Sequence, residues 1–320
     1  MNSAPTVAVV IPSWNSLGLL PRCLGSLVEQ GVELELLAVD NGSSDGSLAY
    51  LEREGVRHLA LPRNVGFAAA VNLGVRETAA ASILVLNADT ALGPSCVGAL
   101  SAALEADPSL GGVQPRILQL ESAAEAPLPD PARARIYSAG QALTRDGRAL
   151  EEGAGETQGP AHRRRHEIFG VCGAACLLRR ELFDQLGGYD ESYFAFYEDV
   201  DLNVRARIAG WRFEYVPEPV VWHVGNASWS AGFARPGAEN ARLVARNRLA
   251  TQLKFMPASA VPRIAAIEVG SLLRAARQRR LRATLRGKLG VLPWLGVLLR
   301  ERRALRREGD PGAARRWLGA

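Results

Sequence analysis

Apolar and polar positions follow two rhythms over the first 90 or so residues. Short apolar runs rich in Val, Ile and Leu are closed by turn residues, as in strands that are buried on both faces of a sheet. Between these runs, apolar residues recur every three or four positions, as in helices that cover a sheet. The predicted strands are residues 7–11, 34–39, 56–61 and 83–86, and the predicted helices are residues 17–30, 47–54 and 67–80. This order predicts an α/β fold with a mostly parallel central sheet flanked by helices.

The pattern weakens in the middle of the chain. Residues 121–135 are rich in Ala and Pro, and residues 144–166 are polar and rich in Gly. Either segment is predicted to be a mobile loop over a site. Regular structure is predicted to return at residues 169–178. It continues as helices at 180–186 and 199–209 and as strands at 213–216 and 220–223.

The end of the chain is helical in pattern and increasingly basic. We therefore predict two parts, a sheet-containing domain at residues 1–235 and a basic helical extension at residues 236–320. Residues 274–320 hold 14 Lys and Arg against 3 Asp and Glu, whereas residues 1–273 hold 24 against 30. Such a basic tail can contact an anionic membrane surface, and a solvated helix packed on the domain is the alternative. We expect no nucleic-acid binding, because aromatic residues do not interleave with the arginines.

No segment of the sequence has the pattern of a signal peptide or a membrane span. The first apolar run is only five residues long, and the later run at 291–299 is shorter than the roughly 20 residues that cross a bilayer. We expect a cytoplasmic protein that is at most peripheral to the inner face of the cell membrane. Cys172 and Cys176 lack a second pair at metal spacing, so the four cysteines are predicted to be buried thiols rather than zinc ligands.

Polar side chains follow two of the predicted strands, at the sheet edge where α/β proteins bind ligands. Asp40 and Asn41 can hydrogen-bond a nucleobase, although Asx residues also stabilise turns. Asp89 can ligate a metal or cap a helix. His223 is a metal ligand if the fold brings it near Asp89, and is otherwise a core or edge histidine.

Three carboxylates, Glu198, Asp199 and Asp201, open a predicted helix. The helix dipole and capping favour acids at this position, so a structural role is one interpretation. The other interpretation is catalysis, because the aromatic run at residues 194–197 would place the acids beside a wall suited to a sugar. Asp201 is assigned the structural role of capping the helix.

Taken in order, the short motifs of this chain resemble the family-2 glycosyltransferases of GT-A fold, in particular the rhamnosyltransferases that act on lipid-linked sugars. The resemblance extends over roughly residues 7–230, and it is the ordered set of motifs that is specific. The matching runs are VVIPSWN at 9–15, VDNGSSDGS at 39–47, NVGFAAAVN at 64–72, LNAD at 86–89, GVCGA at 170–174, GGYDE at 187–191, FYEDVDL at 196–202, AGW at 209–211 and WH at 222–223.

The resemblance implies an inverting transferase of cell-envelope polysaccharide synthesis. Residues 1–235 would bind the nucleotide sugar and catalyse its transfer to a saccharide or a polyprenyl-linked saccharide. L-Rhamnose from dTDP-rhamnose is the first candidate donor, and a UDP-linked hexose or UDP-galactofuranose is the alternative. A protein that binds the sugar nucleotide without catalysis is a further alternative, whereas an oxidoreductase is excluded because the turn at 12–18 lacks the Gly-X-Gly-X-X-Gly pattern.

The resemblance also implies a role for each matching residue. Asp199 would be the catalytic base, with Glu198 orienting the acceptor or the base. Asp89 and His223 would bind Mn²⁺ or Mg²⁺, although Asn87 stands where the family's Asp-X-Asp motif has its first acid. Nucleotide-sugar contacts are implied for Pro12, Ser13, Asn15, Asp40, Asn41, Asn64, Gly66, Phe67, Asn72, Asn87 and Asp89, and acceptor-side positions for Gly170, Gly173 and Trp211.

Overall fold

The first half of the central sheet is parallel. The computed structural model of the protein describes residues 7–122, 128–225, 236–308, 310, 312 and 316–319. The strands of this half are β1 (Val7–Ser13), β2 (Leu34–Asp40), β3 (His58–Ala60) and β4 (Ser82–Leu86), and its helices are α1 (Leu20–Gly25), α2 (Ser47–Arg53) and α3 (Phe67–Arg76). β1 lies between β2 and β4, and β3 pairs with the outer side of β2. The predicted order of strands and helices is confirmed.

The second half of the sheet is mixed. Its strands are β5 (Thr90–Leu92), β6 (Leu110–Gln119), β7 (Ile136–Ser138), β10 (His166–Ile168), β11 (Ala175–Arg179) and β12 (Arg212–His223), and its helices are α4 (Cys96–Ala106), α5 (Arg180–Gln185) and α6 (Glu198–Ile208). β11 is antiparallel to both β4 and β6, whereas β6 and β12 are parallel. The order in the described sheet is β10-β12-β6-β11-β4-β1-β2-β3, with β5 and β7 paired to β12 and β6.

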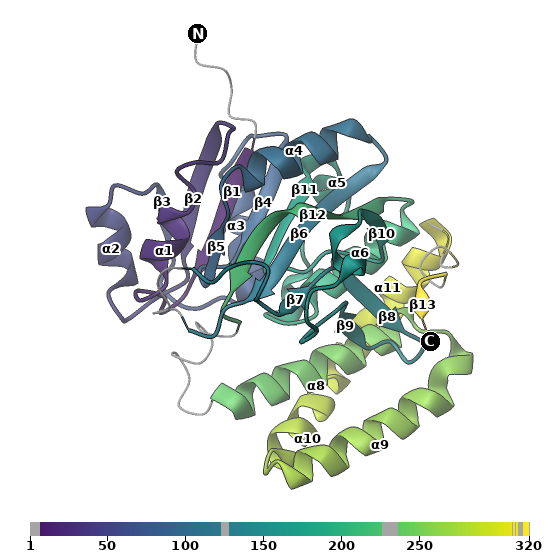
Figure 1. The fold of residues 1–320 in the computed structure, drawn as a ribbon. Coiled ribbons are helices and arrows are strands. Elements are labelled where there is room, and N and C mark those ends of the chain that lie inside the picture. Colours follow the sequence, from purple (N-terminus) through teal and green to yellow (C-terminus); the bar gives the residue numbers. More distant parts are fainter. Residues whose placement is uncertain are drawn as a thin grey trace.

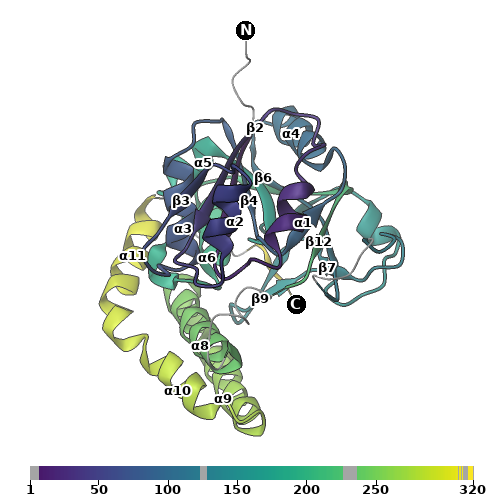
Figure 2. The same ribbon diagram turned by 90° about the vertical axis from the view of Figure 1, so that its left-hand side faces the viewer.

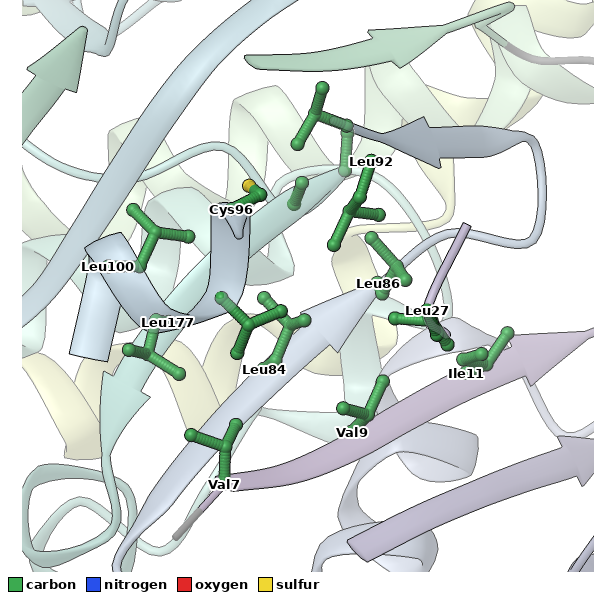
Figure 3. Packing of buried hydrophobic residues seen from close by; sticks show 14 of the residues in the cluster. Val7, Val9, Ile11, Leu27, Leu84, Leu86, Leu92, Cys96, Leu100 and Leu177 are labelled. Atoms are coloured by element: carbon green, nitrogen blue, oxygen red, sulfur yellow. The ribbon is translucent and has the colours of Figure 1, made fainter. Parts of the chain in front are cut away.

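Side chains alternate between two cores, one on each face of the sheet. Val9 and Ile11 of β1 belong to one cluster, whereas Val10 belongs to the other. Figure 3 shows the first cluster, in which side chains of the central strands lie together with those of α4; its members include Val7, Val9, Ile11, Leu84, Leu86, Cys96 and Leu100. Burial of each large apolar side chain contributes about 1.5–3 kcal/mol, and this fixes the sheet register.

Two predicted elements differ in extent from those observed. The helix predicted at residues 17–30 is reduced to α1, and Leu27 is buried from a turn that follows the helix. The two strands predicted at 213–216 and 220–223 are one strand, β12, with an irregular register between Val216 and Val220. Pro217 and Pro219 lie in this gap, where their missing N–H groups cannot pair with β6.

The loop prediction for residues 144–166 is wrong in part. A small sheet is formed there by β8 (Gln141–Thr144), β9 (Ala149–Glu151) and, from the far end of the chain, β13 (Leu318–Gly319). A 3₁₀ turn, η1 (Pro160–Arg163), follows. Of the loop predicted at 121–135, residues 123–127 lie outside the described residues.

The predicted helical extension is present. It consists of α8 (Pro236–Phe255), η3 (Ala258–Ala260), α9 (Val261–Arg277), α10 (Leu281–Leu289), η4 (Leu292–Trp294) and α11 (Leu295–Glu308). Figures 1 and 2 both show α8, α9 and α10 grouped beyond one edge of the sheet-containing body. In the ranges that the structure describes, no helix has the length and apolar character needed to cross a bilayer. The predicted boundary at residue 235 falls outside the described residues and stays a prediction.

Candidate active site

A pocket of about 250 Å³ lies where the carboxyl ends of β1, β4 and β12 meet the start of α6. Eight residues that the sequence predicts for the site line this pocket: Pro12, Phe67, Asn87, Asp89, Gly173, Glu198, Asp199 and His223. Segments more than 130 residues apart in sequence, such as Asp89 and His223, are therefore brought together by the sheet.

An unusual backbone precedes α6. Phe194, Phe196 and Tyr197 have φ angles of 66°, 69° and 72°, in the left-handed region that side chains disfavour. Asn247 of α8 holds this segment, because its buried Nδ2 donates to the carbonyl oxygens of Tyr193, Ala195 and Phe196 at 2.7–2.9 Å. The strained turn places the two acids that follow it in the pocket.

Asp199 is held by three hydrogen-bond donors. Its Oδ2 accepts from the Gly173 N–H at 2.9 Å and from Gln141 Nε2 at 2.8 Å, and its Oδ1 accepts from the Val200 N–H at 2.8 Å. Burial raises the pKa of Asp199, and these three donors oppose the rise because they stabilise the ionised form. The carboxylate is thus fixed in position and still basic enough to accept a proton.

Glu198 differs from its neighbour in its hydrogen bonding. Its Oε2 is buried and, among the described residues, has no hydrogen-bond partner. Burial and then the charge of Asp199 raise the pKa of Glu198 well above its ordinary value. Because Glu198 also lines the pocket, its Oε2 is suited to a hydrogen bond with a ligand.

Asp201 is structural, but it does not act as a helix cap. Its carboxylate is fully buried and pairs with Lys254 Nζ of α8 at 2.6 Å and with Arg205 Nε at 2.6 Å. Burial alone would raise the pKa of Asp201, but the charges of Lys254 and Arg205 lower it below its ordinary value. Asp201 therefore fastens α6 to the helical extension.

Residues that the sequence motifs missed complete the pocket. Tyr137, Gln141 and Glu151 come from β7, β8 and β9, and Val244 comes from α8. These strands are only three or four residues long, and the sequence around them has no clear period of apolar residues. The one signal that could have indicated them is the short alternation of polar and apolar residues around Gln141.

Gln141 connects two carboxylates in the pocket. Its Nε2 donates to Asp199 Oδ2 at 2.8 Å and to Glu151 Oε1 at 3.1 Å, while its Oε1 accepts from Asn203 Nδ2 at 2.8 Å. Burial and the charge of Asp199 raise the pKa of Glu151 to about 7, in spite of hydrogen bonds from Ser138 and Gln141. The electrostatic state of Asp199 is therefore linked to that of Glu151.

Asp89 and His223 are in contact with each other and both line the pocket. His223 Nε2 lies 3.0 Å from Asp89 Oδ1, and both side chains are almost fully buried. Asn87 Nδ2 lies 3.5 Å from the same His223 nitrogen, and the ring of Tyr137 contacts the imidazole edge-on. A carboxylate and an imidazole suit Mn²⁺ or Mg²⁺ in the presence of phosphate oxygens. The residues therefore fit such an ion, although the described residues include no cluster of three or more His, Cys, Asp or Glu that could hold one without a ligand.

Two residues of the expected nucleoside pocket lie just beside the cavity. Ser13 and Asp40 are paired in register at the carboxyl ends of β1 and β2. Asp40 Oδ2 accepts from the Ser43 N–H, as in an Asx turn, but Asp40 Oδ1 and Ser13 Oγ are buried without a partner among the described residues. Such unsatisfied atoms are suited to a ligand that brings its own hydrogen-bonding groups.

The other predicted nucleoside residues hold loops together. Asn41 donates from Nδ2 to Asn64 Oδ1 and to the Gly66 carbonyl, and its Oδ1 accepts from the Val65 N–H. Asn15 Oδ1 accepts from the Ser44 N–H. Gly66 has φ of 95°, and a Cβ there would approach the Phe194 carbonyl oxygen to 2.5 Å, so glycine is required where this loop meets the turn before α6.

Three further predicted site residues also lie outside the lining of the pocket. Asn72 is buried and uses its amide to bind the Tyr189 backbone and Glu191. Trp211 follows α6, about 15 Å along the helix from its start, and donates from Nε1 to Gln185. Gly170 lies beneath α6, where a Cβ would approach Asn203 to 2.3 Å. Asn72 and Gly170 thus shape the scaffold, and Trp211 lies away from the chemistry.

The four cysteines are buried free thiols, as predicted. Burial raises the pKa of Cys23 and of Cys96 to about 12, so neither is a thiolate at neutral pH. Cys172 lines the pocket beside Gly173.

Two solved structures have a fold similar to that of this chain. GalNAc-T7, solved with UDP, GalNAc and Mn²⁺, aligns with a TM-score of 0.55 and 16% identity over 77% of this chain, which spans 48% of the length of that chain. The mannosyltransferase PcManGT from Pyrobaculum calidifontis, solved with GDP-Man and Mn²⁺, aligns with a TM-score of 0.50 and 18% identity over 99% of this chain and 84% of that chain. The fold is thus that of the GT-A class, as the motifs predicted.

Sequence comparison narrows the class further. The family described as Glycosyl transferase family 2 matches residues 8–187, and the chain belongs to this family. N-acetylglucosaminyl-diphospho-decaprenol L-rhamnosyltransferase from Mycobacterium tuberculosis (strain ATCC 25618 / H37Rv) is 30% identical over 243 residues, which are 68% of this chain and 75% of that protein. An N-acetylglucosaminyltransferase from Rhizobium meliloti (strain 1021) is 26% identical over 232 residues, which are 68% of this chain and 50% of that protein.

Proposed function

We propose that this protein transfers a sugar, with inversion, from a nucleotide sugar to a saccharide carried on a lipid diphosphate. The observation that carries the proposal is the fixed carboxylate of Asp199 in the same pocket as Asp89 and His223. L-Rhamnose from dTDP-rhamnose is the first candidate donor, in keeping with the name of the Mycobacterium tuberculosis relative. A UDP-linked hexose or UDP-galactofuranose is the alternative.

The proposed step needs one base and one leaving group. The acceptor hydroxyl attacks the anomeric carbon on the face opposite the nucleoside diphosphate, and Asp199 takes the hydroxyl proton. The new C–O bond forms as the bond from the anomeric carbon to the diphosphate oxygen breaks. The Gly173 N–H and the Gln141 amide hold the Asp199 carboxylate in place. Glu198, whose Oε2 has no partner among the described residues, is available to orient the acceptor.

Asp89 and His223 are proposed to hold Mn²⁺ or Mg²⁺. Both side chains are buried in the pocket and supply one oxygen and one nitrogen donor, as such ions accept. The metal would supply positive charge to the leaving diphosphate. Because Asn87 replaces a carboxylate, we expect the ion to bind weakly without the donor.

The extension is proposed to lie at a membrane surface. Of the eleven exposed large apolar residues within the described part of the chain, eight lie between Val261 and Leu299. Leu281, Leu285 and Leu289 are four positions apart and therefore share one face of α10. The same helix also carries Arg282 and Arg286. Exposed leucines together with arginines favour the interface of an anionic membrane.

A screen of nucleotide sugars by thermal shift tests the function most economically. A donor that binds the native state raises its melting temperature, and we expect this for dTDP-rhamnose or a UDP-sugar in the presence of Mn²⁺. Slow hydrolysis of the same donor then separates an enzyme from a non-catalytic binder. If no nucleotide sugar is bound or hydrolysed, the proposed function is wrong.

A further inference from the structure

A second groove, of about 290 Å³, lies between α8, α9 and α10 in the helical extension. The described residues that line it include Arg248 of α8, Arg274 of α9 and Arg280 just before α10, together with the buried Thr284, and no acidic residue. Figure 2 shows these three helices side by side, away from the strands. A groove of this composition is suited to an anion with several oxygens.

Two of the three arginines of the groove are not neutralised by nearby acids. Arg248 pairs with Glu268 at 2.9 Å, but Lys288 contacts the same carboxylate. Arg274 and Arg280 are exposed, and neither forms an ion pair with any described residue. Burial and the charge of Arg248 lower the pKa of Lys288 to about 8, as expected where positive charges gather.

The groove adjoins the catalytic pocket. Val244 of α8 lines both cavities, and Arg248 is one helical turn further along the same face. Burial raises the pKa of Tyr197, and the charge of Arg248 opposes this rise, so Arg248 lies close enough to act on a residue that lines the pocket. A ligand in the groove can therefore reach toward the pocket that contains Asp199.

We propose that this groove binds the diphosphate group of the acceptor, while the sugar attached to that diphosphate enters the catalytic pocket. The proposal rests on the proposed function, and it assigns Arg274 and Arg280 the role of phosphate ligands. Arginine forms paired hydrogen bonds to phosphate oxygens, and each charged hydrogen bond is worth about tenfold or more in affinity. The groove thereby selects acceptors in which a diphosphate directly follows the first sugar.

Binding of short diphosphates to the full-length protein tests the proposal without requiring activity. The probes are geranyl diphosphate and inorganic pyrophosphate, titrated by calorimetry in the presence of EDTA so that no metal bridges them to Asp89. We compare Arg274→Gln/Arg280→Gln with Arg277→Gln/Arg282→Gln, which removes the same charge from exposed positions of α9 and α10 outside the groove. We expect the Kd of both probes to rise tenfold or more in the first variant and less than twofold in the control.

Two results would overturn the proposal. Equal weakening in both variants would show that the probes respond to overall charge rather than to a site. Binding of phosphatidylglycerol vesicles that depends on Arg274 and Arg280, without binding of either diphosphate, would assign these arginines to lipid headgroups instead. Donor hydrolysis is measured on the same proteins, and its absence in the wild type would contradict the proposed function. The diphosphate titration would still show whether the groove binds a diphosphate, because it does not require activity.

Discussion

Gln141 holds the proposed base, Asp199, in position and stabilises its ionised form. Both protons of its Nε2 are directed at carboxylates, at Asp199 and at Glu151, and Asn203 fixes the orientation of its amide. The Asp199 carboxylate is therefore held in one position, and its charge raises the pKa of the second acid that shares the same donor.

Glu151→Gln should change the pH profile of the enzyme near neutral pH. Burial and the charge of Asp199 raise the pKa of Glu151 to about 7, so a second negative charge develops beside the proposed base as the pH rises through this value. We expect an inflection in kcat/KM against pH near pH 7 for the wild type, and its loss in Glu151→Gln, which has no titrating group at this position. Glu152→Gln, next in sequence but outside the pocket, is the control and should retain the inflection. An inflection near pH 7 that persists in Glu151→Gln would refute this role of Glu151.

Sequence motifs located part of the site at the level of single residues. Asp199, Asp89 and His223 stand in runs whose neighbours identify them, and all three line the pocket. Gln141 and Glu151 could not be found in this way, because they act through hydrogen bonds across a small sheet whose pairing is not encoded locally. Asn72 lies outside the pocket lining for the converse reason, since its motif is local but its amide is used by the distant Tyr189 backbone.

Helix α8 supports the start of α6. Lys254 Nζ is almost fully buried and contacts Asp201 at 2.6 Å, Glu301 at 3.0 Å and Asp190 at 3.3 Å. Asn247, two turns earlier, holds the carbonyls of the strained segment before Glu198. The helical extension is therefore part of the architecture of the site, which no pattern in α8 itself indicates.

Lys254→Met should destabilise the whole protein. Asp201 would stay buried with Arg205 as its remaining cationic partner, and breaking a buried ion pair costs about 3–5 kcal/mol. We expect a lower midpoint in urea unfolding followed by circular dichroism. Arg53→Met, at an exposed surface pair, should change the stability by less than about 0.5 kcal/mol. Equal stabilities for the two variants would mean that Lys254 does not fasten α6.

The sequence predicted strands correctly where burial imposes a clear pattern of apolar residues. β1, β2 and β4 are buried on both faces, so their apolar runs identified them within two residues at each end. β8 and β9 are short and lie in a polar segment, where pairing with each other and with the distant β13 decides the structure. Periodicity within a single segment cannot report such long-range pairing.

At the scale of the whole molecule, the basic extension and the catalytic pocket are expected to work on one substrate. The groove between α8, α9 and α10 would hold the diphosphate, and the exposed leucines beyond it would meet the lipid. This arrangement explains physically why one chain combines an acidic sheet domain with a tail that carries 14 Lys and Arg against 3 Asp and Glu.

Leu285→Glu/Leu289→Glu should weaken membrane association at least tenfold. Both side chains are exposed, so the fold should be retained, whereas acids on this face remove apolar burial and repel anionic lipid. Co-sedimentation with phosphatidylglycerol vesicles measures the effect. Val28→Glu, an exposed position outside the extension, should sediment like the wild type. Unchanged sedimentation of the double variant would show that α10 does not contact the membrane.

The central claim is that Asp199 removes the proton of the acceptor hydroxyl. It is tested most directly by measuring donor binding and sugar transfer in Asp199→Asn, with the donor identified by thermal shift. We predict a thermal shift by the donor equal to that of the wild type, together with a loss of transfer of about 100- to 10,000-fold. Transfer near the wild-type rate, with donor binding intact, would contradict the account.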